Sequence, residues 1–167
     1  RTMRNRLFDP FVRDAHGELL VTGDTRLEEM KKAMMADVFM SGVNAITEDG
    51  KIVNIDGVGN RVAPTIFGPK KVILAAGVNK IVKNIDEALK RVREISAPIN
   101  GKSHVDKHNS KNLADLPCVK TGICVDCFSS DRMFRYTVII EGEKSPASVT
   151  DYLPRIHVII VGEELGI

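Results

Sequence analysis

Residues 72–77 read VILAAG, a continuous apolar run that is closed by a glycine. A strand that is buried on both faces, as in a parallel sheet, has this pattern because neither face requires polar residues. A helix is predicted next, since Asn84 is a favourable N-cap and apolar residues recur at helical spacing over residues 85–95. We expect Pro98 to end this helix, because proline lacks the backbone N–H that a helix interior uses.

Strands and helices alternate over the rest of the chain. Asp49-Gly50 separates two apolar segments and predicts a hairpin, because glycine accepts the positive φ of a tight turn. A capping box that begins at Thr25 predicts a helix as far as Ala36. Further strands are predicted at residues 38–40, 137–140 and 157–161. This alternation predicts a three-layer, mainly parallel, Rossmann-like α/β fold.

The domain organisation predicted for residues 1–167 is a single α/β domain. Residues 100–135 have no convincing periodicity, so we expect a long loop there that contains all the cysteines. Loops of this length in compact domains are usually functional or disordered.

Composition limits the function. The net charge of +2, the 5% aromatic content and the absence of Trp argue against nucleic-acid binding. No apolar run is long enough to span a membrane, so we expect no membrane partner. The 3 cysteines cannot all pair with one another, which favours a reducing, cytoplasmic location.

Glycine, asparagine and charged residues gather in the segments that follow the predicted strands. Glycines let backbone N–H groups approach an anion, and Asn, Arg or Lys side chains can bind its oxygens. Such loops form the ligand crevice of open α/β sheets. The alternative is that Gly and Asn only form turns and that the lysine is a solvated surface residue. The candidate ligand-binding residues are Asn44, Thr47, Asn54, Asp56, Gly57, Gly59, Asn60, Arg61, Asn79 and Lys80.

Cys118, Cys124 and Cys127 have a spacing that occurs in metal sites, since the thiolates of C-x-x-C can point at one ion. Zinc and iron–sulfur sites normally need four ligands, and His104 or His108 are candidates for the fourth. His157 lies in an apolar strand and is expected to be a hydrogen-bonded core residue. The alternative is three unligated thiols, with a reversible disulfide in C-x-x-C. A catalytic cysteine has no assignable general base.

Several uncommon strings occur in one order from about Asp37 to the end of the sequence. They are DVFMSGVNAITEDG at 37–50, VNIDGVGNR at 53–61, FGPKKV at 67–72, AGVNK at 76–80, APIN at 97–100, CVKTGICVDC at 118–127 and GEELG at 162–166. In this order they resemble the LUD-domain family, the group that contains lactate-utilisation protein C. The resemblance adds Asn100 to the candidate ligand-binding residues.

The resemblance implies a fold like that of the NagB/RpiA/CoA-transferase group, whose relatives bind sugar phosphates or acyl-CoA. It also implies a role in oxidising L-lactate to pyruvate, together with iron–sulfur partner subunits. We therefore expect a small anionic ligand, either lactate-like or phosphorylated. Alternatives are a ligand-binding or regulatory module without turnover, and a sugar-phosphate or CoA-type transferase or isomerase.

The sequence departs from the family pattern in two places. Family members usually carry an N-terminal Rossmann-like segment with a Gly-Gly-Ser-x-Thr loop, a string that this sequence does not contain. We therefore expect that segment to be missing, and apolar faces left uncovered by it would favour a homodimer. Phe134 stands where the family often has a further cysteine, which leaves three thiols in this chain.

Overall fold

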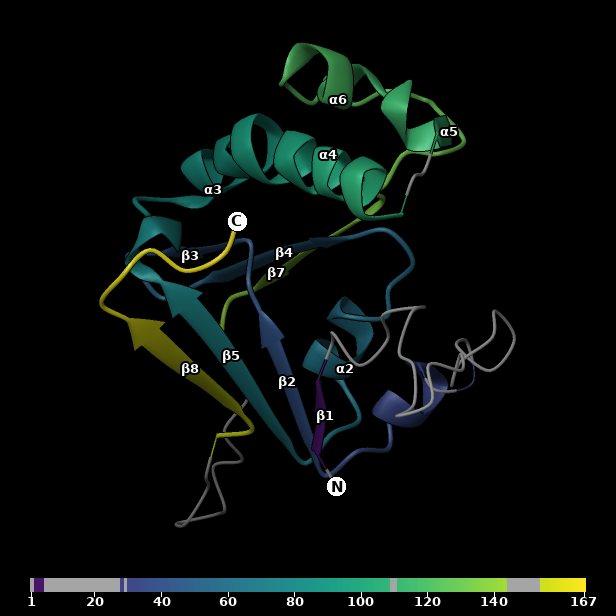
Figure 1. The fold of residues 1–167 in the computed structure, drawn as a ribbon. Coiled ribbons are helices and arrows are strands. Elements are labelled where there is room, and N and C mark those ends of the chain that lie inside the picture. Colours follow the sequence, from purple (N-terminus) through teal and green to yellow (C-terminus); the bar gives the residue numbers. More distant parts are fainter. Residues whose placement is uncertain (1, 5–27, 29, 109–110, 144–153) are drawn as a thin grey trace. The chain divides into compact units, whose positions relative to one another are not determined.

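The structure is a computed structural model that describes residues 2–4, 28, 30–108, 111–143 and 154–167 (Figure 1). The chain divides into two compact units. Unit 1 comprises Arg1–Gly42, Gly59–Ala75 and Glu143–Ile159, and unit 2 comprises Val43–Val58, Ala76–Gly142 and Ile160–Ile167. The prediction of a single domain stays a prediction, because this division describes compactness and not independent folding.

A parallel sheet forms the framework of unit 1. Its strand order is β1 (Thr2–Arg4), β2 (Val38–Gly42), β5 (Lys71–Gly77) and β8 (Ile156–Val161), and the arrows of β2, β5 and β8 point the same way (Figure 1). The last residues of β5 and β8 belong to unit 2. The predicted fold class, α/β with a mainly parallel Rossmann-like sheet, is confirmed.

The two central strands of this sheet, β2 and β5, carry apolar side chains that are buried. Phe39 of β2 lies opposite Val72 of β5 in the parallel register, and both side chains are fully buried together with Leu74. A short helix, α2 (Val62–Ile66), follows the turn at Asn60. Strand β1 was not predicted, because three residues are too few to show a pattern.

The helix predicted over residues 25–36 is only partly described. Residues 28 and 30–33 are helical, whereas the expected start at Thr25 lies outside the described residues. Ala33 is fully buried, in agreement with the core-facing side of the prediction.

Unit 2 contains a mixed sheet in the order β6 (Ile81–Val82), β3 (Ala45–Thr47), β4 (Ile52–Asp56) and β7 (Tyr136–Ile140). Strands β3 and β4 form the predicted antiparallel hairpin, with Gly50 at a φ of 91° in its turn. β4 also pairs antiparallel with β7, and β3 pairs parallel with β6.

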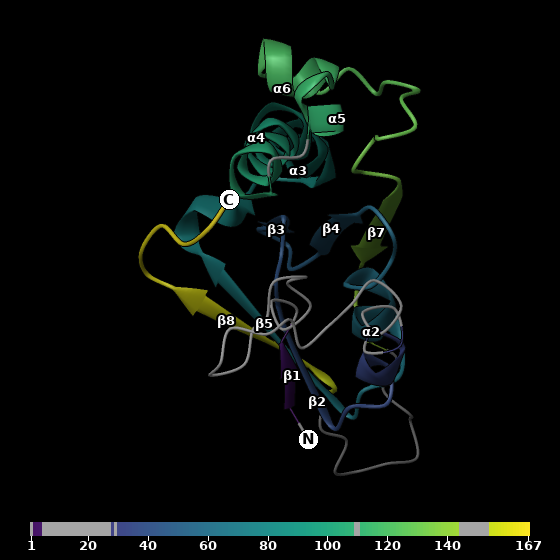
Figure 2. The ribbon, with the colours of Figure 1, turned by 45° about the vertical axis from the view of Figure 1, so that its right-hand side comes forward.

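Helix α3 (Ile85–Arg91) packs on this hairpin, and Figure 2 shows it beside α4 (Ala97–His108) on the same side of the strands. Ala88 lies in one buried cluster with Ala45 and Val53. The predicted cap is confirmed, because the Asn84 side chain accepts a 3.0 Å hydrogen bond from the Glu87 backbone N–H. Exchange of such an asparagine for alanine costs about 1 kcal/mol.

The prediction that Pro98 ends the helix is wrong. After Arg91 the chain widens into a π-helical turn, Val92–Ser96, and continues as α4 (Ala97–His108). The Ala97 N–H bonds to the Val92 carbonyl, five residues back. A proline ring clashes with the carbonyl four residues before it, and a wider turn relieves that clash.

The prediction of a long loop at residues 100–135 is also wrong for most of residues 100–121, which are helical. This segment contains the rest of α4, then α5 (Lys111–Ala114) and α6 (Pro117–Thr121). Both short helices contact α4, and they lie on its side away from the sheet of unit 2 (Figures 1 and 2). Residues 122–135 remain irregular, and we call them the cysteine loop. Across the described part of the chain, no helix combines the length and apolar character needed to cross a bilayer.

Candidate functional site

Two buried cationic side chains donate hydrogen bonds to the carbonyls of the two residues that follow β2. The Lys80 Nζ donates a 3.0 Å hydrogen bond to the Val43 carbonyl, and an Nη1 of Arg91 donates a 2.8 Å bond to the Asn44 carbonyl. Lys80 is 6% exposed and Arg91 is 7% exposed. Lys80 comes from the 3₁₀ turn Val78–Lys80 after β5, and Arg91 from the end of α3.

Arg91 is held by oxygen atoms that carry no net charge. Its Nε donates to the Asn79 carbonyl at 3.1 Å, and its Nη1 also donates to the Ser96 hydroxyl at 3.2 Å. Within the described residues it forms no ion pair with a carboxylate. Burial lowers the pKa of Arg91, although guanidinium groups stay protonated in proteins. A buried positive charge without a carboxylate partner is the kind of environment that favours an anion.

Asn79 joins the same site to the end of the chain. Its Oδ1 accepts a 3.1 Å hydrogen bond from the Leu165 N–H, and its Nδ2 donates a 3.2 Å bond to the Gly166 carbonyl. Gly77 permits this approach, because a Cβ built there would lie 2.3 Å from the Leu165 nitrogen and 2.6 Å from the Glu163 carbonyl oxygen.

We call Asn44, Asn79, Lys80 and Arg91 the strand-end cluster.

Asn44 and Asn54 support each other across the hairpin. The Asn54 Oδ1 accepts a 3.1 Å bond from the Asn44 N–H, and the Asn44 Oδ1 accepts a 2.9 Å bond from the Ile55 N–H. The Asn54 Nδ2 is buried and has no hydrogen-bond partner among the described residues. A buried donor of this kind normally binds a water or a ligand atom.

The other predicted ligand residues have different positions. The Thr47 hydroxyl bonds to Asp49 and to the Lys51 N–H, so it stabilises the hairpin turn. The Asp56 Oδ1 accepts a 2.7 Å bond from the Gly57 N–H at the end of β4. Asn100 is half-buried in α4. Gly59, Asn60 and Arg61 belong to unit 1, in the turn before α2, and a part for them in binding stays a prediction.

Arg91 and Ser96 were not predicted as site residues. A signal for Arg91 exists in the sequence, because it lies three residues after Ala88 and one before Val92, on the edge of the apolar face of α3. A charged residue on that face has to find buried partners. Ser96 carries no comparable signal, since its contact with Arg91 depends on the π-helical turn.

The three cysteines come together at one small cavity of about 20 Å³. Cys118 lies on α6, while Cys124 and Cys127 lie in the cysteine loop, and all three are free and half-buried. Burial raises the pKa of the Cys118 thiol, and the nearby Cys124 and Cys127 raise it further when charged. Arg132, Met133, Phe134, Ala97 and Leu116 complete the lining.

This arrangement does not fit a metal ion or an iron–sulfur cluster as it stands. No group of His, Cys, Asp or Glu in the described ranges is arranged to hold a metal. A cavity of about 20 Å³ has room for little more than one water molecule. His104 does not line it, and the His108 side chain lies outside the described residues. Metal binding stays a prediction.

His157 differs in detail from its prediction. It lies in β8 as expected, but its Nε2 is buried without a hydrogen-bond partner in the part of the chain that is described.

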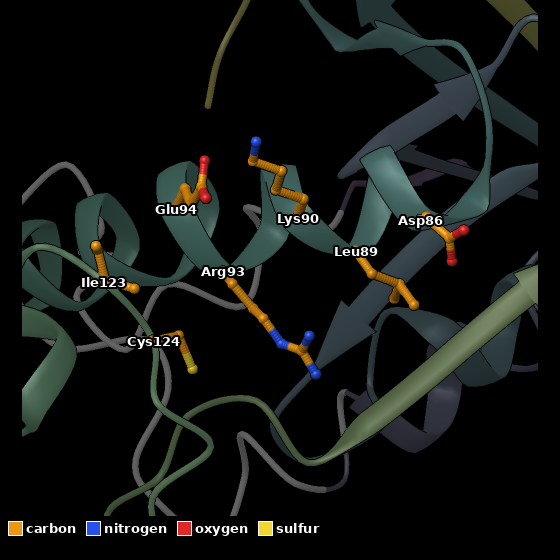
Figure 3. A pocket seen from close by; sticks show the side chains of 7 residues that line it. All are labelled: Asp86, Leu89, Lys90, Arg93, Glu94, Ile123 and Cys124. Atoms are coloured by element: carbon orange, nitrogen blue, oxygen red, sulfur yellow. The ribbon is translucent and has the colours of Figure 1, made fainter.

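A larger, open cavity of about 340 Å³ lies beside α3 (Figure 3). It is lined by Asp86, Leu89, Lys90, Arg93, Glu94, Ile123 and Cys124. Cys124 lines both this cavity and the small one. Neither cavity is lined by a residue of the strand-end cluster.

Comparisons with known proteins assign the family. No curated protein and no solved structure matches the chain significantly. The family model of the LUD domain matches residues 4–122, which is more than half of the 167 residues. That family is associated with lactate-utilisation proteins. The match includes Asn44, Asn79, Lys80, Arg91 and Cys118. The chain belongs to the LUD-domain family.

Proposed function

We propose that the strand-end cluster binds a small organic anion, and that the protein serves in the oxidation of L-lactate to pyruvate together with iron–sulfur partner subunits. Family membership supports the lactate-type substrate. The cluster supports the anionic character of the ligand, independently of the family.

The observation that carries this proposal is the burial of Arg91 without a carboxylate partner among the described residues. Hydrogen bonds from its Nε and Nη1 to two backbone carbonyls fix the guanidinium plane. A guanidinium that is held in this way is pre-organised to bind a carboxylate or phosphate. A bound anion would compensate the charge that the fold has buried.

The neighbouring residues would orient the ligand. Lys80 supplies a second buried cation in the same segment, and the two asparagines supply amide groups that accept or donate hydrogen bonds. No residue of the cluster is assigned as a general base. The part of this chain is therefore to bind and position the anion, while the partner subunits would accept the electrons.

Equilibrium binding by calorimetry tests the proposal with L-lactate, D-lactate and inorganic phosphate as probes. Replacement of Arg91 by Gln should weaken binding by at least about tenfold, since hydrogen bonds to charged groups contribute roughly 1.5–3 kcal/mol. Asn79→Asp, which leaves Arg91 in place, should also weaken binding by repulsion. Lys102→Gln is the matched control, because it removes an exposed cation from α4.

The outcomes separate the alternatives. Unchanged affinity in folded Arg91→Gln and Asn79→Asp would contradict the site, and no affinity for any of the three anions would contradict the function. Preference for phosphate over lactate would favour a phosphorylated ligand, as in a transferase or isomerase. Tight lactate binding without electron transfer to an added acceptor, in the presence of iron–sulfur partners, would leave a regulatory module.

A further inference from the structure

Two contacts described here fix the cysteine loop to the helix beside it, and the first depends on Pro98. In the π-helical register the Ala97 N–H bonds to Val92, so the next donor in line would be Pro98, which has no N–H. The Arg93 carbonyl is therefore left for another donor. The Cys124 N–H takes that position with a 2.9 Å hydrogen bond.

Asp126 supplies the second contact with the helix, an ion pair with Arg93 at 2.9 Å. Within the loop, Asp126 also pairs with Arg132 at 3.0 Å, and Arg132 donates to the Cys127 carbonyl at 3.3 Å. Asp126 has a φ of 50°, the left-handed region that non-glycine residues rarely adopt. This backbone turns between Cys124 and Cys127 and brings both side chains to the same cavity. Backbone held in this region is often found at functional sites.

The two cavities give the cysteines different surroundings. Cys124 lines the open cavity of about 340 Å³, whereas Cys118 and Cys127 line only the small one. Figure 3 shows the Cys124 sulfur and the Arg93 guanidinium extending on the same side of the helix. Lys90 and Arg93 add positive charge to this cavity, and Asp86 and Glu94 add negative charge. A small molecule with carboxylate and ammonium groups matches such a lining.

We propose that Cys124 and Cys127 form a thiol–disulfide exchange site, and that the open cavity accepts a low-molecular-weight disulfide with zwitterionic character. The Cys124 thiolate attacks one sulfur of that disulfide, whose S–S bond breaks and releases one thiol. The Cys127 thiolate then attacks the Cys124 Sγ and releases the second thiol. The two cysteines lose two electrons and two protons, which the small disulfide gains.

The third cysteine is not part of this exchange. Cys118 is half-buried and lines only the small cavity, so it does not face a small disulfide in the open cavity. Its position on α6, outside the C-x-x-C segment, also separates it from the turn at Asp126.

Oxidised glutathione added to the reduced, full-length protein tests the proposal, with peptide mass spectrometry as the readout. We expect a Cys124–Cys127 disulfide in the unmodified protein. Cys127→Ser should stop at a glutathione mixed disulfide on Cys124, and Cys118→Ser should behave like the unmodified protein. Lys90→Gln should slow mixed-disulfide formation by about threefold, as expected for an exposed charge contact. It should not slow the reaction with cystamine, which has no carboxylates.

Three results would overturn the site: trapping of glutathione on Cys118 or Cys127 instead of Cys124, a disulfide that includes Cys118, or no disulfide at all. Stoichiometric iron or zinc on the three thiols after anaerobic purification would overturn it too. An equal effect of Lys90→Gln and the control Lys102→Gln would remove the role of the open cavity. None of these results bears on anion binding at the strand-end cluster, so the two proposals fail separately.

Discussion

The backbone N–H of Cys124 is hydrogen-bonded, at 2.9 Å, to the carbonyl of Arg93 in a π-helical turn. The contact exists because Pro98 cannot donate to that carbonyl. A proline in a helix therefore determines where a loop far along the sequence is attached.

Replacement of Pro98 by Ala should weaken this attachment. Alanine supplies an N–H that competes for the Arg93 carbonyl, and the Cys124 amide should then exchange with solvent about fivefold faster, the equivalent of about 1 kcal/mol. Hydrogen exchange followed by mass spectrometry or NMR measures it. Unchanged protection of Cys124, with α4 intact, would contradict the competition argument.

Substitutions of Asp126 separate its charge from its backbone conformation. Asp126→Asn removes both ion pairs but keeps a residue that tolerates a positive φ, so we expect a loss of less than about 1 kcal/mol. Asp126→Ala should cost about 1 kcal/mol more, because alanine is disfavoured at a φ of 50°. Urea unfolding compares the two. Equal losses would mean that the left-handed turn carries no measurable strain.

Gly77→Ala tests the close approach of the C-terminal segment. Its Cβ would lie within 2.6 Å of two backbone atoms, so the segment at 163–165 has to move, and we expect a loss of more than about 2 kcal/mol. Gly142→Ala is the matched control, since a Cβ there has no atom within 4 Å. Thermal unfolding of both variants should show a lowered transition temperature for Gly77→Ala alone.

Asn79 should control how firmly the same segment is held. Asn79→Ala removes both hydrogen bonds, and Asn79→Asp keeps an acceptor for Leu165 but loses the donor to Gly166. Limited proteolysis after residue 162 should therefore be fastest for Ala and intermediate for Asp. An order with Asp fastest would show that repulsion between its carboxylate and the Gly166 carbonyl outweighs the bond to Leu165.

The pH dependence of Cys118 alkylation should reflect the burial of its thiol. Because the pKa of Cys118 is raised by burial, iodoacetamide should label it at a higher pH than a cysteine in a short unstructured peptide. The stabilising effect of its protonated form is present below the ordinary cysteine pKa and is lost as the pH rises through the raised value. Peptide mapping after timed labelling measures the profile. Labelling of Cys118 at the same pH as the reference peptide would contradict the burial effect.

Local rules predicted the elements whose cause lies within a few residues. The apolar run of β5, the Asp-Gly turn and the Asn84 cap are examples, because each depends on neighbours in sequence. The prediction that Pro98 ends the helix failed, because the rule for proline assumes an α-helical register and this segment has a π-helical one. The short helices α5 and α6 have too few residues to show periodicity.

The candidate site was predicted less completely than the fold. Asn44, Asn79 and Lys80 were predicted as ligand residues because they follow strands, where ligands of α/β proteins bind, and their part in binding stays a prediction. The buried guanidinium of Arg91 could not be identified in this way, because its partners are backbone carbonyls that any sequence provides. Cavities are likewise absent from sequence patterns, so the common lining of the three cysteines emerged only from the structure.

The use of the Arg93 carbonyl also affects how the cysteine loop can detach. Since no helical N–H competes for that carbonyl, release of Cys124 leaves the hydrogen bonds of α3 and α4 unbroken. Release of the segment from Cys124 to Asp126 also breaks the exposed Arg93–Asp126 ion pair, which salt screens. We therefore expect this segment to open locally at moderate ionic strength while the helix beside it stays folded.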